Sequence, residues 1–151
     1  MMYLLFFLIL GLDQATKFWV ETAFVPHRAY PVTPFFNVFL TYNQGVSFSL
    51  LWGGKDRQYL LIALSCIICL FLGKWFLTEK NKWTRVGLIC VLAGALGNVL
   101  DRLRFHKVVD FLDFYLYSYH WPAFNVADIA ICVGAGLIVL GTFLESRRKH
   151  V

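Results

Sequence analysis

Long apolar stretches alternate with short polar segments along this chain of 151 residues. A helix that crosses a bilayer core needs about 20 mostly apolar residues. Three stretches reach or approach that length, and the run at residues 2–12 reaches it when DQATKFWVETAF continues it. The pattern predicts four membrane-spanning helices in a single integral-membrane domain, residues 1–151. Their expected ranges are 2–22, 59–77, 84–104 and 124–144.

The first apolar run lacks the marks of a cleaved signal peptide. No lysine or arginine precedes it, and no small-residue cleavage site follows it. We therefore expect this run to be retained as the first spanning helix.

Two longer segments, residues 24–57 and 103–123, connect the predicted helices on one side. In the first, FFNVFLTYNQGVSFSLLW is rich in aromatic and β-branched residues and is interrupted at NQG, which predicts a short two-stranded element with a turn. Backbone groups outside a helix cannot stay unsatisfied in lipid, so this element should lie at the outer interface. The expected fold class is an all-α membrane protein with a small extracytoplasmic β-like cradle between helices one and two.

The composition agrees with a membrane protein. Hydrophobic residues make up 59% of the chain and the mean hydropathy is +0.63, whereas soluble domains contain about 45–50% apolar residues. The net charge of +5 does not indicate nucleic-acid binding, because the basic residues lie at helix ends and in connections rather than in one patch. The cysteines fall inside apolar helices and the histidines are scattered, so we expect no metal site and no cofactor.

The basic residues give a weak indication of orientation. Seven lie between helices two and three and at the C-terminus, against six in the segments on the opposite side. The positive-inside rule then predicts that both termini are cytoplasmic.

Helix one carries an acid and a base, Asp13 and Lys17, at membrane depth. They are four residues apart with the acid first, a spacing that favours an ion pair. Such a pair removes much of the cost of inserting each partner, so a structural role is expected for it.

A larger polar group gathers where helices three and four should meet at the outer side. Its members are Asn98, Asp101, Arg102, Asp110, Asp113, Asn125 and Asp128. The residues at 98, 101 and 102 share one helix face, as do those at 125 and 128. The group holds more acids than one arginine neutralises, so at least one carboxyl should be protonated or share a proton. Because excess acid at this depth is costly, we interpret the group as functional rather than as a network that only fixes helix register.

Two carboxyls near the membrane surface suit aspartic peptide hydrolysis. An ionised acid acts as general base toward water, and a protonated one polarises the carbonyl. Depth alone favours Asp101 with Asp128 as this pair. A serine or cysteine mechanism is not expected, because no histidine or lysine falls at the right depth beside the outer group. A small proton-coupled transporter using intramembrane carboxylates and a non-catalytic membrane scaffold remain the alternatives.

Five motifs in order, DQATK, TYNQGVSFS, GNVLDR, VVDFLDF and FNVADIAI, resemble those of lipoprotein signal peptidase, the type II signal peptidase of bacteria. The resemblance implies a four-helix aspartic endopeptidase of the bacterial inner membrane, with its active site near the extracytoplasmic face. Its substrates would be diacylglyceryl-modified prolipoproteins, cleaved before the lipidated cysteine. Membrane lipids and globomycin-type inhibitors would be further partners.

The same resemblance assigns roles to residues. It implies Asp110 and Asp128 as the catalytic dyad, in place of the pair that depth favours. The residues that would position substrate and dyad are Asn43, Asn98, Arg102 and Asn125. The supporting residues would be Asp13, Lys17 and Asp101.

Overall fold

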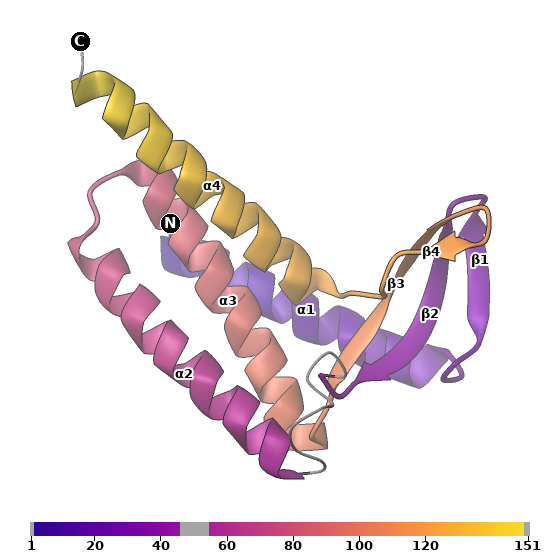
Figure 1. Cartoon of the computed structure of the whole chain (residues 1–151). Coiled ribbons are helices and arrows are strands. Elements are labelled where there is room, and N and C mark those ends of the chain that lie inside the picture. Colours follow the sequence, from indigo (N-terminus) through magenta and orange to yellow (C-terminus); the bar gives the residue numbers. More distant parts are fainter. Residues whose placement is uncertain (1, 46–54, 150–151) are drawn as a thin grey trace.

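The structure is a computed structural model that describes residues 2–45 and 55–149, and four long helices dominate it (Figure 1). They are α1 (Met2–Ala23), α2 (Lys55–Thr78), α3 (Lys82–Phe105) and α4 (Val126–Lys149). All four are long and apolar enough to cross a membrane. The four helices predicted from the apolar pattern are therefore confirmed.

Helix α3 is the centre of the bundle and packs against the other three helices. Its contact with α4 is close because glycines face backbone across it: a Cβ on Gly94 would collide with the carbonyl oxygen of Ala127, and one on Gly87 with that of Gly134. Small residues allow membrane helices to approach in this way. Helix α2 has few buried residues, so most of its surface is available to lipid.

An antiparallel sheet stands at one end of the bundle (Figure 1). Its order is β1 (Ala29–Thr33), β2 (Phe36–Asn43), β3 (Val108–Leu116) and β4 (Tyr119–His120). A bulge in β2 between Val38 and Thr41 shifts the register against β3, so that Thr41 is opposite Asp110. The strand β2 therefore pairs on one side with β1, which precedes it directly in the chain, and on the other side with β3, about seventy residues away.

The predicted two-stranded element is confirmed only in its first strand, which corresponds to β2. The second strand of that prediction falls on residues 46–52, which lie outside the described residues. The described neighbours of β2 are β1 and β3. Strands β3 and β4, in the segment between helices three and four, were not predicted.

Strand β3 is tied directly to the start of α4. The backbone N–H groups of Phe111 and Leu112 donate to the carbonyl of Phe124 at 3.0 and 2.9 Å, and the Phe124 N–H donates back to Leu112 at 3.1 Å. These bonds fold the segment after α3 back onto the N-terminal end of α4. Residues 110 and 128, which belong to different elements, are thereby brought to one place.

Candidate active site

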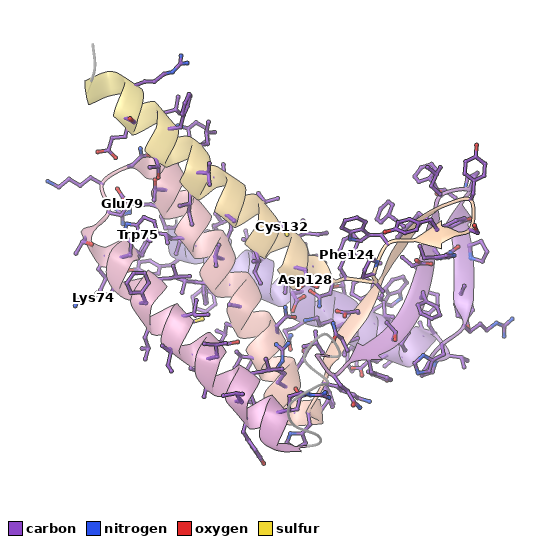
Figure 2. The ribbon with its side chains drawn as sticks, in the orientation of Figure 1. Lys74, Trp75, Glu79, Phe124, Asp128 and Cys132 are labelled. Carbon is purple, nitrogen blue, oxygen red and sulfur yellow. The ribbon has the colours of Figure 1, made fainter. Side chains whose placement is uncertain are left out.

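The first turn of α4 contains a reciprocal cap. The side-chain oxygen of Asn125 accepts a hydrogen bond from the backbone N–H of Asp128 at 2.9 Å, and the Asp128 carboxylate accepts one from the Asn125 N–H at 3.2 Å. This is the geometry of a capping box, in which two unpaired donors of a helix start are satisfied together. Asp128 is labelled beside Phe124 in Figure 2. The fold therefore fixes the Asp128 side chain at the start of the helix.

Asn125 also binds the second acid. Its side-chain N–H₂ lies 2.7 Å from Oδ1 of Asp110, 3.2 Å from Oδ1 of Asn98 and 3.3 Å from the carbonyl of Val109. The Asn98 amide in turn donates to Oδ1 of Asp128 at 2.9 Å. Asn125 is fully buried. One asparagine thus contacts both Asp110 and Asp128, and a second asparagine closes the ring between the helices.

Asp110 is nearly inaccessible, with a relative exposure of 1%. Burial is the main cause that raises the pKa of this carboxyl to about 6, and the negative charge of Asp128 adds to it. Hydrogen bonds from the side chains of Asn43 and Asn125 and the charge of Lys17 act in the opposite direction. A carboxyl with a pKa near 6 gains and loses its proton close to neutral pH, as a general acid or base must do.

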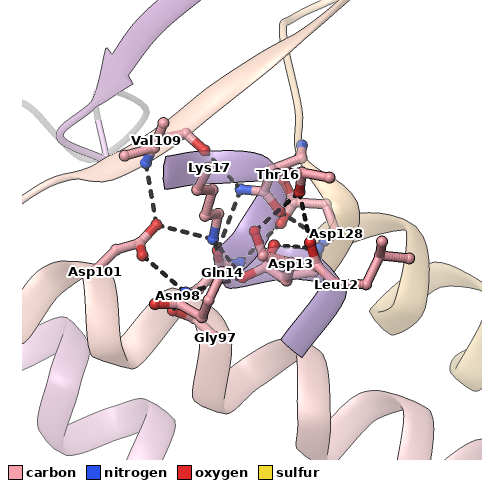
Figure 3. A network of polar contacts seen from close by, with 12 residues as sticks. Leu12, Asp13, Gln14, Thr16, Lys17, Gly97, Asn98, Asp101, Val109 and Asp128 are labelled. Atoms are coloured by element: carbon pink, nitrogen blue, oxygen red, sulfur yellow. Dashed lines mark hydrogen bonds and ion pairs between the residues drawn. The ribbon is translucent and has the colours of Figure 1, made fainter. Parts of the chain in front are cut away.

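A second polar network lies beside this pair and is centred on Lys17 (Figure 3). The Lys17 ammonium contacts Asp13 at 2.9 Å, Asp101 at 2.8 Å and Oδ1 of Asn98 at 3.1 Å. The ion pair predicted between Asp13 and Lys17 is confirmed, although it is only part of a larger arrangement. Each of the three ammonium hydrogens has an acceptor, so this buried cation is fully satisfied.

The two acids bound by Lys17 also hold backbone. Asp13 accepts a hydrogen bond from the N–H of Ala127 at 2.9 Å, which fixes α4 to α1. Asp101 accepts one from the N–H of Val109 at 3.2 Å, directly before Asp110. These carboxylates therefore join three helices and β3 around the pair formed by Asp110 and Asp128.

Gln14 is a member of this network that the sequence analysis missed. Its side-chain N–H₂ donates to Asp13 and Asp101, at 3.1 Å in each case (Figure 3). Its side-chain oxygen accepts a hydrogen bond from Arg104 at 3.1 Å. Its place between Asp13 and Lys17 in the motif DQATK was the available signal. A glutamine on a membrane-spanning helix needs hydrogen-bond partners for both the N–H₂ group and the carbonyl oxygen of its side-chain amide.

The remaining predicted residues divide between the site and its surroundings. Arg102 donates to the carbonyl of Asn98 at 3.3 Å and interacts electrostatically with Asp128 and Asp110. Asn43 is exposed at the end of β2, with its oxygen bound to the N–H of Gly45 at 2.7 Å.

Asp113 lies apart from the pair. Its carboxylate accepts a hydrogen bond from Asn37 at 2.9 Å and is 2.9 Å from Nδ1 of His120.

The expectation that no lysine lies at the depth of the outer group is wrong, because Lys17 contacts Asn98. Its three contacts occupy it, so it is not free to activate a nucleophile. No group of three His, Cys, Asp or Glu side chains that could hold a metal ion is found within residues 2–45 and 55–149.

The chain is similar to known proteins over most of its length. The sequence model of the family described as signal peptidase (SPase) II matches residues 5–144. The lipoprotein signal peptidase of Ralstonia nicotianae is 44% identical over 140 residues, covering 91% of this chain and 80% of that protein. The lipoprotein signal peptidase of Syntrophotalea carbinolica is 40% identical over 147 residues, covering 95% of this chain and 91% of that protein.

A solved structure extends the similarity to the fold. A bacterial membrane enzyme determined by the in meso method at 1.9 Å resolution superposes with a TM-score of 0.85 at 29% identity, covering 93% of this chain and 91% of that one. The family match gives no support to a transporter. Multiple apolar helices and this relationship make the chain a multi-pass bacterial membrane protein. The chain belongs to the signal peptidase II family of aspartic peptidases, which remove signal peptides from prolipoproteins.

Proposed function

We propose that Asp110 and Asp128 are the catalytic dyad with which this peptidase cleaves prolipoproteins. The observation that carries the proposal is the double contact of Asn125, which donates its side-chain amide to Asp110 and its backbone N–H to Asp128. Asp110 supplies the proton, because burial and the neighbouring charge raise its pKa to about 6. Asp128 accepts two N–H donors, as a carboxylate does.

The proposed reaction follows from these states. The Asp128 carboxylate takes a proton from a water molecule, whose oxygen attacks the scissile carbonyl carbon, while Asp110 donates its proton to the carbonyl oxygen. A tetrahedral diol results. Asp110 then takes back the hydroxyl proton as the C–N bond breaks, and the proton held by Asp128 passes to the leaving nitrogen. Arg102 lies close enough to both acids to stabilise the negative charge of the pair.

Asp101, the partner that helix depth favoured, is a poorer candidate for this chemistry. Its two oxygens are bound by Lys17, Gln14 and the N–H of Val109. A carboxylate in an ion pair with a buried lysine neither carries a proton to donate nor has a free oxygen for water. We assign it to support, together with Asp13 and Lys17, and assign Asn43, Asn98, Arg102 and Asn125 to positioning.

We further propose that the substrate is a diacylglyceryl-modified prolipoprotein, cleaved before the lipidated cysteine, and that globomycin-type inhibitors occupy the same site. An apolar surface on the same sheet as Asp110 fits a lipid-modified chain at the membrane interface. It consists of the exposed side chains of Phe35, Phe114, Leu116, Tyr119 and Trp121 on the sheet. Aromatic side chains of this kind concentrate at membrane–water boundaries.

We also propose that the sheet and the dyad face the extracytoplasmic side, with both termini cytoplasmic. The connection between α2 and α3 and the C-terminal end of α4 lie at the opposite end of the bundle from the sheet (Figure 1). That end carries the seven basic residues of the shorter segments. The positive-inside rule favours this orientation, although six basic residues lie on the other side. Labelling of single cysteines in intact cells tests it.

A cleavage assay on a lipid-modified prolipoprotein in detergent tests the dyad. Asp110→Asn and Asp128→Asn should each lower turnover by at least about a hundredfold, since each removes a general acid or base. Asp113→Asn is the matched control, because it makes the same change in the same strand at an acid bound to Asn37 and His120. Near-normal turnover in either dyad variant would refute the assignment. Loss of turnover in Asp101→Asn with retention in Asp110→Asn would restore the pair that depth favoured.

A further inference from the structure

The end of the bundle away from the dyad contains a cleft of about 1090 Å³, between the α2–α3 connection and the last turns of α4. Figure 2 labels Glu79 at this end and Asp128 near the other end of α4. Along α4, Asp128 and Arg147 are about 28 Å apart at 1.5 Å per residue. The cleft is therefore separate from the peptidase site. We propose that it binds the phosphate of an anionic phospholipid headgroup.

The first support is the charge of the cleft walls. Lys80, Lys82 and Arg147 line it. The Lys82 ammonium lies 5.3 Å from the centre of the Trp83 ring, and the Arg147 guanidinium lies 4.8 Å from that of Phe143. An aromatic face holds a cation by its ring electrons and leaves its N–H donors available. Lysine and arginine donors of this kind bind phosphate oxygens.

Two acids also line the cleft, Glu79 and Glu145. The Glu79 carboxylate is turned toward its own connection: one oxygen accepts the N–H groups of Asn81 and Lys80 at 2.8 Å, and the other accepts the Trp75 indole N–H at 2.9 Å. These bonds, chiefly the one from Asn81, lower the pKa of Glu79. Its charge therefore organises the connection. The cations outnumber the acids in the lining, so an anionic headgroup complements the cleft better than a zwitterionic one.

The walls of the cleft are fixed to each other before any ligand binds. The Asn81 side chain caps α3, accepting the N–H of Trp83 at 2.9 Å, and its amide donates to the carbonyl of Gly141 on α4 at 2.9 Å. A Cβ on Gly141 would collide with Thr84, so the two helices are in close contact here. A preorganised site loses little conformational entropy when a ligand enters it.

The position of the cleft favours a membrane lipid over a soluble anion as its ligand. Helices α2, α3 and α4, each long and apolar enough to span a membrane, all have an end here. Trp83, 41% exposed, and Leu144 provide apolar wall next to the cations. Headgroup phosphates and interfacial tryptophans share this depth, and basic pockets between spanning helices bind anionic headgroups.

Native mass spectrometry of the full chain in detergent, titrated with phosphatidylglycerol or phosphatidylcholine, tests the proposal. The wild type should retain phosphatidylglycerol in preference to phosphatidylcholine. The double variant Lys82→Gln/Arg147→Gln should bind phosphatidylglycerol about 30-fold more weakly, at about 1 kcal/mol for each cation removed. Arg28→Gln is the control, because it removes one cation from the sheet end. The charge-conserving Lys82→Arg/Arg147→Lys should keep most of the affinity.

Each other outcome would overturn the proposal. If phosphatidylcholine were retained as well as phosphatidylglycerol, the cleft would not recognise the headgroup by its charge. If the double variant bound phosphatidylglycerol as tightly as the wild type, the lipid would bind elsewhere on the protein. Displacement of phosphatidylglycerol by millimolar inorganic phosphate would identify a soluble anion as the ligand. Prolipoprotein turnover in the double variant should equal that of the wild type, so failure here and failure of the dyad assignment are distinguishable. It also shows that the variant is folded.

Discussion

Replacing Asp110 by asparagine should stabilise the folded protein at neutral pH while it abolishes cleavage. The carboxyl has an ordinary pKa of 3.8 that is raised to about 6 in the folded state, chiefly by burial. Between these values the folded protein holds a proton that the unfolded chain has released. The contribution of this proton to the stability of the folded state is therefore fully present below pH 3.8 and is lost as pH rises through about 6.

The size of the effect follows from the shift. A shift of about two pKa units corresponds to about 3 kcal/mol lost by the wild type above pH 6, at 1.36 kcal/mol per unit. Asparagine avoids this cost, and its side-chain oxygen still accepts the hydrogen bond that Asn125 donates to Oδ1. The variant should thus gain up to about 3 kcal/mol over the wild type at pH 8, or about 6–12 °C in unfolding temperature.

Thermal unfolding in detergent micelles at pH 4 and pH 8 measures the difference. The gain of Asp110→Asn should be small at pH 4 and large at pH 8. Asp113→Asn provides the comparison, because its carboxylate already has His120 and Asn37 as partners and should give no gain at either pH. A gain at Asp110 that does not depend on pH, or a loss at pH 8, would refute the electrostatic argument.

Four further outcomes are expected. The pH profile of kcat/KM should fall on both sides, with its alkaline limb near the Asp110 pKa of about 6; a profile flat into strongly alkaline pH would contradict a dyad that needs one proton. Lys17→Met leaves two buried carboxylates without their cation and should cost about 3–5 kcal/mol of stability, measured by thermal unfolding. Gly94→Val should destabilise by about 1–3 kcal/mol or more through collision with α4, whereas Gly136→Ala, with open space around it, should be tolerated. Chelators should leave turnover unchanged, because the described residues offer no ligand set.

Apolar runs were sufficient to find the helices, because a helix that spans lipid needs about 20 consecutive apolar residues and few segments of soluble proteins contain such a run. The largest error lies at the end of α4, predicted at 144 and observed at Lys149. The polar sequence ESRRK continues the helix beyond the apolar run. Hydropathy marks the part of a helix inside lipid, and it does not mark where the hydrogen-bonded turns stop.

Strand β3 could not be predicted in the same way. Its sequence VVDFLDFYL places two acids three residues apart, so the polar positions do not follow the two-residue alternation of a half-buried strand. Both acids are buried, but for different reasons: Asp113 meets Asn37 and His120, and Asp110 meets Asn125. These partners come from distant segments that pair only when the sheet forms. Helix spacing alone therefore favoured Asp101 over Asp110.

The network around Lys17 helps to explain why the pKa of Asp110 is raised. Asp13 and Asp101 share the buried lysine and also hold the backbone of α4 and β3. Asp128 is bound by two N–H donors at a helix start. Within residues 2–45 and 55–149, no ion pair joins Asp110 to a cation. Asp13 and Asp101 bind the Lys17 cation and fix the elements that carry Asp110 and Asp128. Asp110 is therefore buried with asparagine amides as its partners, and it keeps its proton up to about pH 6.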